Sequence, residues 1–182
     1  MIITKEKIIL ECEEIIKLEG ICNINIRKVA KKCGVSIGTI YNYFPSKSDL
    51  IIELIRKIWS DSLNMSFKDV DNYTFVEYIE KMLVSIKAID DKYPNFLKEH
   101  SIILSNESRI VGKNVMSNYF SHLKLSMKKI LLNDKLVKKT LFDDDFTIEV
   151  FLDYIFSIFM IVISDSTYDY KLFLKFIEKY LY

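Results

Sequence analysis

From Asn25 to Leu50 the chain reads NIRKVAKKCGVSIGTIYNYFPSKSDL, and this stretch carries three helix starts in quick succession. Asn25, Ser36 and Ser46 are residue types that cap a helix by accepting a hydrogen bond from a backbone N–H of its first turn. Gly34 lies between the first two starts, where a glycine readily ends a helix in the left-handed conformation. The stretch therefore predicts the starts of three helices, of which the first two form a helix-turn-helix.

Apolar residues at helical spacing indicate which faces of these helices are buried. We expect the inward side chains of the helix-turn-helix to be Ile26, Val29, Ala30, Cys33, Ile40 and Phe44. Upstream, Thr4 is expected to cap a further helix that Gly20 ends. Its buried face is predicted to hold Ile8, Ile9, Cys12, Ile15 and Ile16. A three-helix head at the N-terminus follows, with a fourth helix running from Lys47 into the low sixties.

The second helix of a helix-turn-helix enters the major groove and presents its N-terminal residues to base edges. Gly38 has no side chain, which allows a close approach to DNA. Thr39 offers a hydroxyl and a methyl group that can meet a thymine methyl. Tyr41, Asn42 and Tyr43 combine flat bodies with hydrogen-bonding tips. The segment from Ser36 to Phe44 is thus the predicted reading element.

Charge is unevenly distributed along the chain. The formal net charge is +1, yet residues 21–57 hold seven basic and two acidic residues, a net charge of +5. Such a basic module indicates contact with a polyanion, although a solvated lysine-rich face is an alternative. Arg27 and Lys47 lie on the first turns of their helices, where the backbone also favours phosphate. Lys31 and Lys32 are interpreted as solvated.

These residues and motifs resemble the DNA-binding signature of the TetR family of transcriptional regulators, including a Tyr-x-Tyr-Phe element and a lysine after a capping serine. The resemblance implies an all-α fold, with a helix-turn-helix DNA-binding domain over residues 1–48 and a helical ligand-binding and dimerisation domain over residues 49–182. It implies phosphate contacts by Arg27, Ser36, Tyr41, Tyr43 and Lys47. It places Ile37, Gly38, Thr39 and Asn42 nearer the bases. Ile37 departs from the family pattern, which often has a polar or basic residue there, and this indicates a close fit and methyl contacts more than a dense set of hydrogen bonds.

The rest of the chain is rich in aromatic residues, since 20 of the 23 Phe and Tyr residues follow residue 66. Helices are predicted over residues 73–92, 95–105, 107–132, 146–164 and 170–181. The last two are so apolar that a monomer would expose a large patch, so we expect a homodimer through them. Two-fold symmetry suits a palindromic operator in double-stranded DNA. The alternative is that these helices pack on their own body.

A small-molecule effector is the second expected partner, and the sequence does not identify it. Side chains of the middle helices could line a cavity for a small apolar or aromatic compound, or could be plain core. They are Met82, Tyr93, Phe96, Met116, Tyr119 and Phe120, with His100 or His122 as a polar handle. The leading hypothesis is a repressor that this ligand releases from DNA. The alternative is a DNA-binding scaffold whose body recruits a protein and senses no small molecule.

An enzyme is the weakest hypothesis, because the chain has no nucleophile elbow, phosphate loop or HExxH motif. Glu149 and Asp153 are one helical turn apart, but a polar strip explains them better than an acid pair. Cys12, Cys22 and Cys33 lack metal-ligand spacing, so no metal or cofactor is expected, and a redox role for Cys33 is the minor alternative to a core role.

The same residues predict a soluble, cytoplasmic protein with reduced cysteines. The first residues lack the apolar core of a signal peptide. The longest charge-free run of the best membrane candidate, Tyr154 to Ser164, has 11 residues, against roughly 20 for a membrane span.

Overall fold

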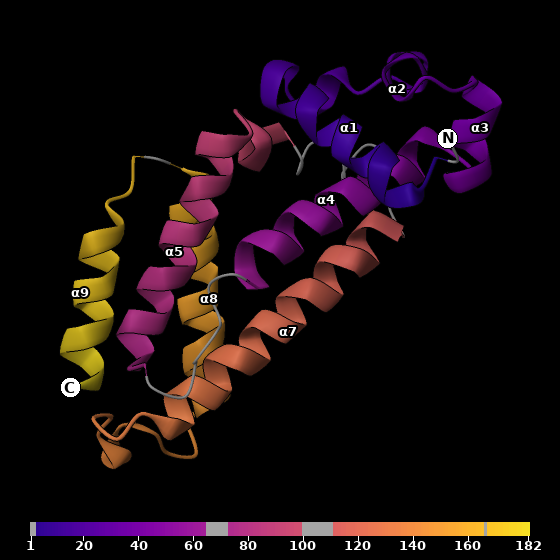
Figure 1. Cartoon of the computed structure of the whole chain (residues 1–182). Helices are drawn as coiled ribbons and strands as arrows, with labels where there is room; N and C mark the ends of the chain where they lie inside the picture. Colours follow the sequence, from indigo (N-terminus) through magenta and orange to yellow (C-terminus); the bar gives the residue numbers. More distant parts are fainter. Residues whose placement is uncertain (1–2, 65–72, 100–110, 166) are drawn as a thin grey trace. The chain divides into compact units, whose positions relative to one another are not determined.

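The computed structural model describes residues 3–64, 73–99, 111–165 and 167–182, and every regular element in these ranges is helical (Figure 1). The elements are α1 (Lys5–Glu19), η1 (Ile21–Asn23), α2 (Ile26–Cys33), α3 (Ile37–Tyr43), α4 (Lys47–Asn64), α5 (Phe75–Lys92), α7 (Val111–Asn133), η3 (Lys139–Leu141), α8 (Ile148–Ser164) and α9 (Tyr170–Leu181). The all-α prediction is confirmed. The predicted helix over residues 95–105 lies partly outside the described residues.

The chain forms two compact units. Unit 1 comprises Met1–Asp61 and Ala88–Met116, and unit 2 comprises Ser62–Lys87 and Ser117–Tyr182. The helices α4, α5 and α7 each contribute residues to both. The predicted DNA-binding domain, residues 1–48, lies within unit 1. Most of α4 belongs to unit 1, because its buried side chains pack there, as Trp59 does against Phe96 with ring centroids 6.4 Å apart.

The predicted caps define the helices of the N-terminal head. Thr4, Asn25 and Ser36 accept hydrogen bonds from the backbone N–H groups of Lys7, Arg27 and Thr39, at 3.2, 2.9 and 3.0 Å. Gly34 ends α2 at φ 67° and ψ 32°, a conformation in which a Cβ atom causes strain. Ser46 and Asp49 cap α4 reciprocally: the Ser46 N–H donates to Oδ2 of Asp49 (3.0 Å), and the Asp49 N–H donates to Oγ of Ser46 (3.1 Å).

The core of unit 1 contains nearly all the side chains predicted to face inward. Buried there are Ile8, Ile9, Cys12, Ile15, Ile16, Ile26, Val29, Ala30, Ile40 and Phe44. Cys33 is only half-buried. Glu13 is the charged side chain that is buried among the described residues, and its Oε2 accepts a hydrogen bond from the Tyr93 hydroxyl at 3.0 Å. This bond joins α1 to the residue that follows α5.

Unit 2 is held together by aromatic contacts and by polar bonds at its edges. Phe151 of α8 packs against Phe75 of α5, with ring centroids 6.1 Å apart. Asp134, which follows α7, accepts hydrogen bonds from the Phe75 N–H (2.7 Å) and the Tyr182 hydroxyl (2.5 Å). Asp134 therefore joins the end of α7 to the start of α5 and to the C-terminal residue.

The polar strip of α8 forms ion pairs with α7. Glu149 pairs with Lys128, and the carboxylate of Asp153 lies 2.6 Å from the ammonium of Lys124. The hydrogen bond from Lys128 lowers the pKa of the Glu149 carboxyl. Both carboxylates thus join α8 to α7.

Three of the side chains proposed to line a cavity belong to the buried core. Met82, Tyr93 and Phe96 are buried, the first in unit 2 and the others in unit 1. Phe120 packs edge-on against Phe156, with centroids 5.4 Å apart, and His122 is exposed. The side chains of His100, Met116 and Tyr119 lie outside the described residues. Met82, Tyr93 and Phe96 therefore agree with the plain-core alternative, whereas His122 is a surface residue.

Within the described ranges, no helix combines the length and the hydropathy that crossing a bilayer requires. In the same ranges, His, Cys, Asp and Glu side chains nowhere gather in groups of three that could hold a metal ion.

Candidate nucleic-acid interface

The predicted DNA-contacting residues all lie on the surface of unit 1. Ile37 and Tyr41 on α3 expose 40% and 45% of their area, and Thr39, Tyr43 and Lys47 are half-buried. The remaining members of the set, Arg27, Ser36, Gly38 and Asn42, are exposed. Ile40 and Phe44 are buried beneath them and hold α3 on the core. The seven residues of α3 therefore present one face outward on a fixed support.

A surface hollow of about 360 Å³ brings together residues from three helices. It is lined by Asn25, Ile26, Arg27, Ile37, Tyr41 and Lys47. Arg27 stands on the first turn of α2 and Lys47 is the first residue of α4, so two cations separated by twenty positions in sequence flank one depression. Such a hollow, with two cations and a phenol on its walls, suits a phosphate group.

Most basic residues between positions 21 and 57 form ion pairs with carboxylates of the protein. Lys28 pairs with Glu19, Lys57 pairs with Asp61, and the Lys32 ammonium lies 3.7 Å from Glu11. Arg56 forms a hydrogen-bonded ion pair with Glu53 at 2.5 Å, and this bond lowers the pKa of the Glu53 carboxyl. Within the described part of the chain, the cations of this segment that form no ion pair are Arg27, Lys31 and Lys47. Two of these three line the hollow.

Hydroxyl groups on and beside α3 are partly engaged within the protein. The hydroxyl oxygens of Ser36 and Thr39 lie 2.9 Å apart and share a hydrogen bond. The Tyr43 hydroxyl donates to the backbone carbonyl of Ile3 at 2.6 Å. Tyr43 therefore anchors the segment before α1 on α3, a role that sequence reasoning did not foresee because it depends on a contact across 40 positions.

Two lining residues of the hollow, Asn25 and Ile26, were not among the predicted contacts. Asn25 was recognised only as a helix cap, and Ile26 only as a core residue. The signal that could have found them is their place beside Arg27 at the start of α2, where a cap and its neighbours surround any anion bound by the helix N-terminus.

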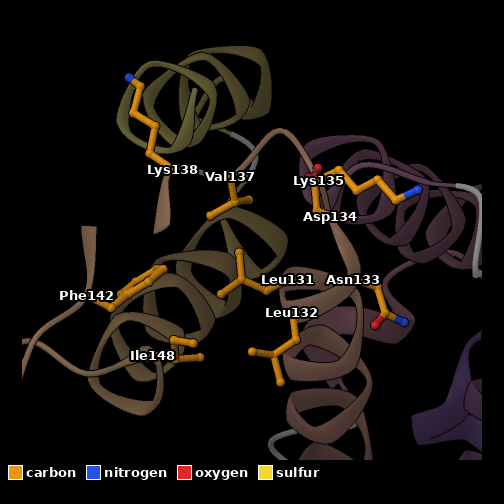
Figure 2. Close-up of a pocket in the computed structure, with 9 residues that line it drawn as sticks. All are labelled: Leu131, Leu132, Asn133, Asp134, Lys135, Val137, Lys138, Phe142 and Ile148. Atoms are coloured by element: carbon orange, nitrogen blue, oxygen red, sulfur yellow. The ribbon is translucent and has the colours of Figure 1, made fainter. Parts of the chain in front are cut away.

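A second hollow, of about 560 Å³, lies in unit 2 between the end of α7, the following turn and the start of α8 (Figure 2). Its apolar lining consists of Leu131, Leu132, Val137, Phe142 and Ile148. Its polar lining consists of Asn133, Asp134, Lys135 and Lys138, and the two lysine side chains point away from the apolar group (Figure 2). The hollow thus offers mainly hydrocarbon to a ligand.

The last two helices carry apolar side chains on both sides. Phe173, Leu174, Ile177 and Leu181 of α9 are buried. Leu172 and Phe176 of the same helix expose 67% and 55% of their area. On α8, the exposed apolar residues are Val150, Tyr154 and Ile161, and their spacing places them on one face. Packing within unit 2 therefore leaves part of the apolar surface of α8 and α9 exposed.

Comparisons with known proteins agree with this arrangement. Residues 8–54 match the family model described as "Bacterial regulatory proteins, tetR family". The chain is similar to the nucleoid occlusion factor SlmA of Aliivibrio fischeri, with 27% identity over 122 residues, 65% of this chain and 61% of that protein. It is also similar to an HTH-type transcriptional regulator of Haemophilus influenzae, with 30% identity over 102 residues, 56% of this chain and 51% of that protein. The matches thus span about three fifths of these relatives' length or less.

A solved structure shows the same fold. The crystal structure of BioQ with its double-stranded DNA operator superposes with a TM-score of 0.60 and 12% identity, over 91% of this chain and 86% of that one. The match to the family model covers α2 and α3, and with them most of the residues that line the hollow. Over residues 8–54, which include α2, α3 and the start of α4, the chain is thus similar to the tetR family of bacterial regulatory proteins.

Proposed function

We propose that the chain is a DNA-binding transcriptional regulator and not an enzyme. The observation that carries this proposal is the hollow beside α3, where Arg27 and Lys47 lie without carboxylate partners among the described residues. A DNA phosphate in this hollow would meet both cations and the Tyr41 phenol, with α3 directed to the adjacent major groove. The nine residues predicted from the sequence remain the proposed contact set.

The test is selection of binding sites from a random library of duplex DNA, using the full-length chain, followed by affinity measurements over a range of salt concentrations. Lys47→Ala is expected to weaken binding to all sequences alike and to reduce the slope of log K against log salt by about one. Lys31→Ala is the matched control, because Lys31 also forms no ion pair among the described residues but lies outside the hollow. An equal loss of DNA affinity in both variants would mean that the phosphate contact lies outside this hollow.

The proposed assembly is a homodimer on a palindromic operator. The exposed apolar residues of α8 and α9 support it, since a second copy of the same two helices would cover them as a four-helix interface. A two-fold dimer carries two copies of α3, which can address successive major grooves of a palindrome.

The proposed regulation is release of the operator by a small apolar or aromatic effector, which makes the chain a repressor. The hollow at the end of α7 supports a ligand role, because its volume falls within the roughly 300–1,000 Å³ of small-molecule sites and its apolar lining comes from five side chains. A ligand shifts the equilibrium between the DNA-binding form and the released form only by the difference between its affinities for these two forms.

A large side chain that fills the hollow at the end of α7 tests the proposed release of DNA by a ligand. Leu132 lines it, whereas Leu125 lies on the same helix, is similarly exposed and does not line it. Leu132→Trp is expected to abolish operator release by those apolar compounds that release the wild-type protein, and Leu125→Trp is expected to leave release unchanged. If apolar compounds release the operator equally from both variants, the hollow is not the effector site.

The scaffold alternative is favoured by one observation. Leu125 and Leu132 on α7, with Leu136 in the following turn, expose 66%, 59% and 62% of their area, and seven-residue spacing places the first two on one face. A protein partner could cover them. Binding of a protein with no release of DNA by any apolar compound would support this alternative.

A further inference from the structure

The exposed face of α3 is short of hydrogen-bonding groups that could read bases. No charged residue occurs between Ser36 and Phe44. The bidentate pairing of an arginine or lysine with guanine, the commonest specific contact to a base, therefore has no source on α3. Arg27 and Lys47 lie on the walls of the hollow, which we assign to phosphate.

The hydroxyl group at the N-terminal end of α3 is turned back toward the helix cap. Oγ1 of Thr39 shares a hydrogen bond with Oγ of Ser36 (2.9 Å), and Ser36 is also occupied as acceptor of the Thr39 N–H (3.0 Å). With Oγ1 held toward Ser36, the methyl group of Thr39 takes another staggered position, away from the cap. The first turn of α3 thus offers hydrocarbon from Thr39 as well as from Ile37.

Ile37 is an exposed apolar residue beside the hollow. It is the first residue of α3, it borders the hollow, and it leaves 40% of its area exposed. Gly38 follows, and a Cβ atom there would meet nothing closer than the Ser36 hydroxyl at 3.7 Å, so the space outside Gly38 is open to a groove. An isoleucine next to open space suits a methyl group better than a polar base edge.

We propose that α3 reads thymine C5-methyl groups through Ile37 and the methyl of Thr39, so that each operator half-site carries thymines opposite the first turn of this helix. The inference rests on the proposed DNA-binding function and specifies its substrate. In the major groove the thymine methyl is the apolar feature that distinguishes T·A from the other base pairs. Asn42, further along α3, remains available for one adenine.

The experiment removes single methyl groups from the DNA. Operator duplexes obtained by selection with the full-length chain are remade with deoxyuridine in place of each thymine in turn, which keeps the base pair and its hydrogen bonds. At the one to three thymines opposite Ile37 and Thr39, affinity is expected to fall about fourfold per methyl, the factor expected for burial of one such group. Substitution at thymines outside the half-sites is the control and is expected to have no effect.

The role of the Ile37 side chain is tested with the variant Ile37→Ala. Ile37 is exposed, and a thermal melt checks that the variant keeps the fold. This variant is expected to bind the thymine operator about as weakly as the wild-type protein binds the matching deoxyuridine operator. It is also expected to lose its discrimination between the two. Asn42→Ala, the matched control on the same helix, should keep that discrimination.

The possible outcomes distinguish failure of the proposed DNA binding from failure of thymine-methyl readout. If selection enriches no sequence and DNA binding is absent, the proposed function fails, and the inference fails with it. If a specific operator is bound but deoxyuridine is tolerated within twofold at every thymine, DNA binding stands and methyl readout is overturned. Discrimination that survives in Ile37→Ala at every thymine likewise overturns the role of Ile37.

Discussion

Gly38 occupies the second position of α3, where the protein's own packing does not require a glycine. A Cβ atom would lie 3.7 Å from the Ser36 hydroxyl, an ordinary contact distance. Gly38→Ala is therefore expected to raise the free energy of unfolding by up to about 1 kcal/mol, because alanine is the better helix former. Operator affinity is expected to fall by about tenfold or more, since the added methyl enters a close interface. Urea unfolding and fluorescence anisotropy with labelled DNA measure the two effects.

Gly34→Ala is the control, because its expected effect on the free energy of unfolding has the opposite sign. Gly34 has φ 67°, so alanine there is expected to lower stability by roughly 1 kcal/mol. A loss of stability in both variants would show that Gly38 serves the fold and not the approach to DNA.

Tyr78 makes stability depend on alkaline pH. Burial raises the pKa of its hydroxyl to about 12, against about 10 in the unfolded chain. Between these values the native state holds a proton that the unfolded state has lost, so the free energy of unfolding falls as pH rises above about 10. The expected slope from this residue is at most about 1.4 kcal/mol per pH unit. Urea unfolding at pH 9, 10 and 11 should show it, and Tyr78→Phe should reduce it; an unchanged slope would contradict the assignment.

At the scale of elements, the buried bond between Glu13 and Tyr93 joins α1 to the end of α5. The Tyr93 hydroxyl donates to Oε2 of Glu13, while Oε1 has no hydrogen-bond partner among the described residues. Burial and the adjacent carboxylate both raise the pKa of Tyr93. Nearby, the N–H of Cys22 donates to the Glu99 carboxylate at 3.3 Å. Two carboxylates therefore tie the helices of the head to residues 93–99.

Tyr93→Phe is expected to destabilise the protein by about 1.5–3 kcal/mol, because it removes a hydrogen bond to a charged group and leaves the buried carboxylate without a donor. Chemical denaturation measures the loss. The double variant Glu13→Leu with Tyr93→Phe should recover much of it, since replacing both partners removes the uncompensated charge. Losses that simply add in the double-mutant cycle would mean that the two groups do not interact.

The whole-molecule prediction concerns dimerisation. Phe176 exposes 55% of its area on α9 and belongs to the proposed interface. Phe176→Glu is expected to give a monomer in sedimentation analysis, because two charges would be buried at a two-fold contact. Operator affinity is then expected to fall about 100-fold or more, since the second half-site is no longer engaged through a linked partner.

Leu125→Glu is the matched control for the dimer. It places the same charge at an exposed leucine of α7 and is expected to leave both the oligomeric state and the operator affinity unchanged. A wild-type protein that sediments as a monomer and binds one half-site would contradict the proposed assembly.

Local chemistry determined what could be predicted from the sequence. The caps at Thr4, Asn25, Ser36 and Ser46 act within three residues of themselves, so their hydrogen bonds follow from the order of residues alone. Periodicity likewise predicts α9 over the residues at which it is found, because a helix depends on contacts three and four positions apart.

Only the tertiary structure decided which groups meet across long separations. The Glu13–Tyr93 bond spans 80 positions and the Tyr43–Ile3 bond spans 40, and no local pattern encodes either. Among the described residues, Arg27 and Lys47 form no ion pair and lie beside one hollow, whereas in the sequence they are two of seven equivalent cations. Similarly, periodicity revealed a broad apolar stripe on α9, but packing decided that Phe173 is buried and Phe176 is exposed. The physical reason is that helix formation is a local process, while burial and charge compensation depend on neighbours that only the folded chain supplies.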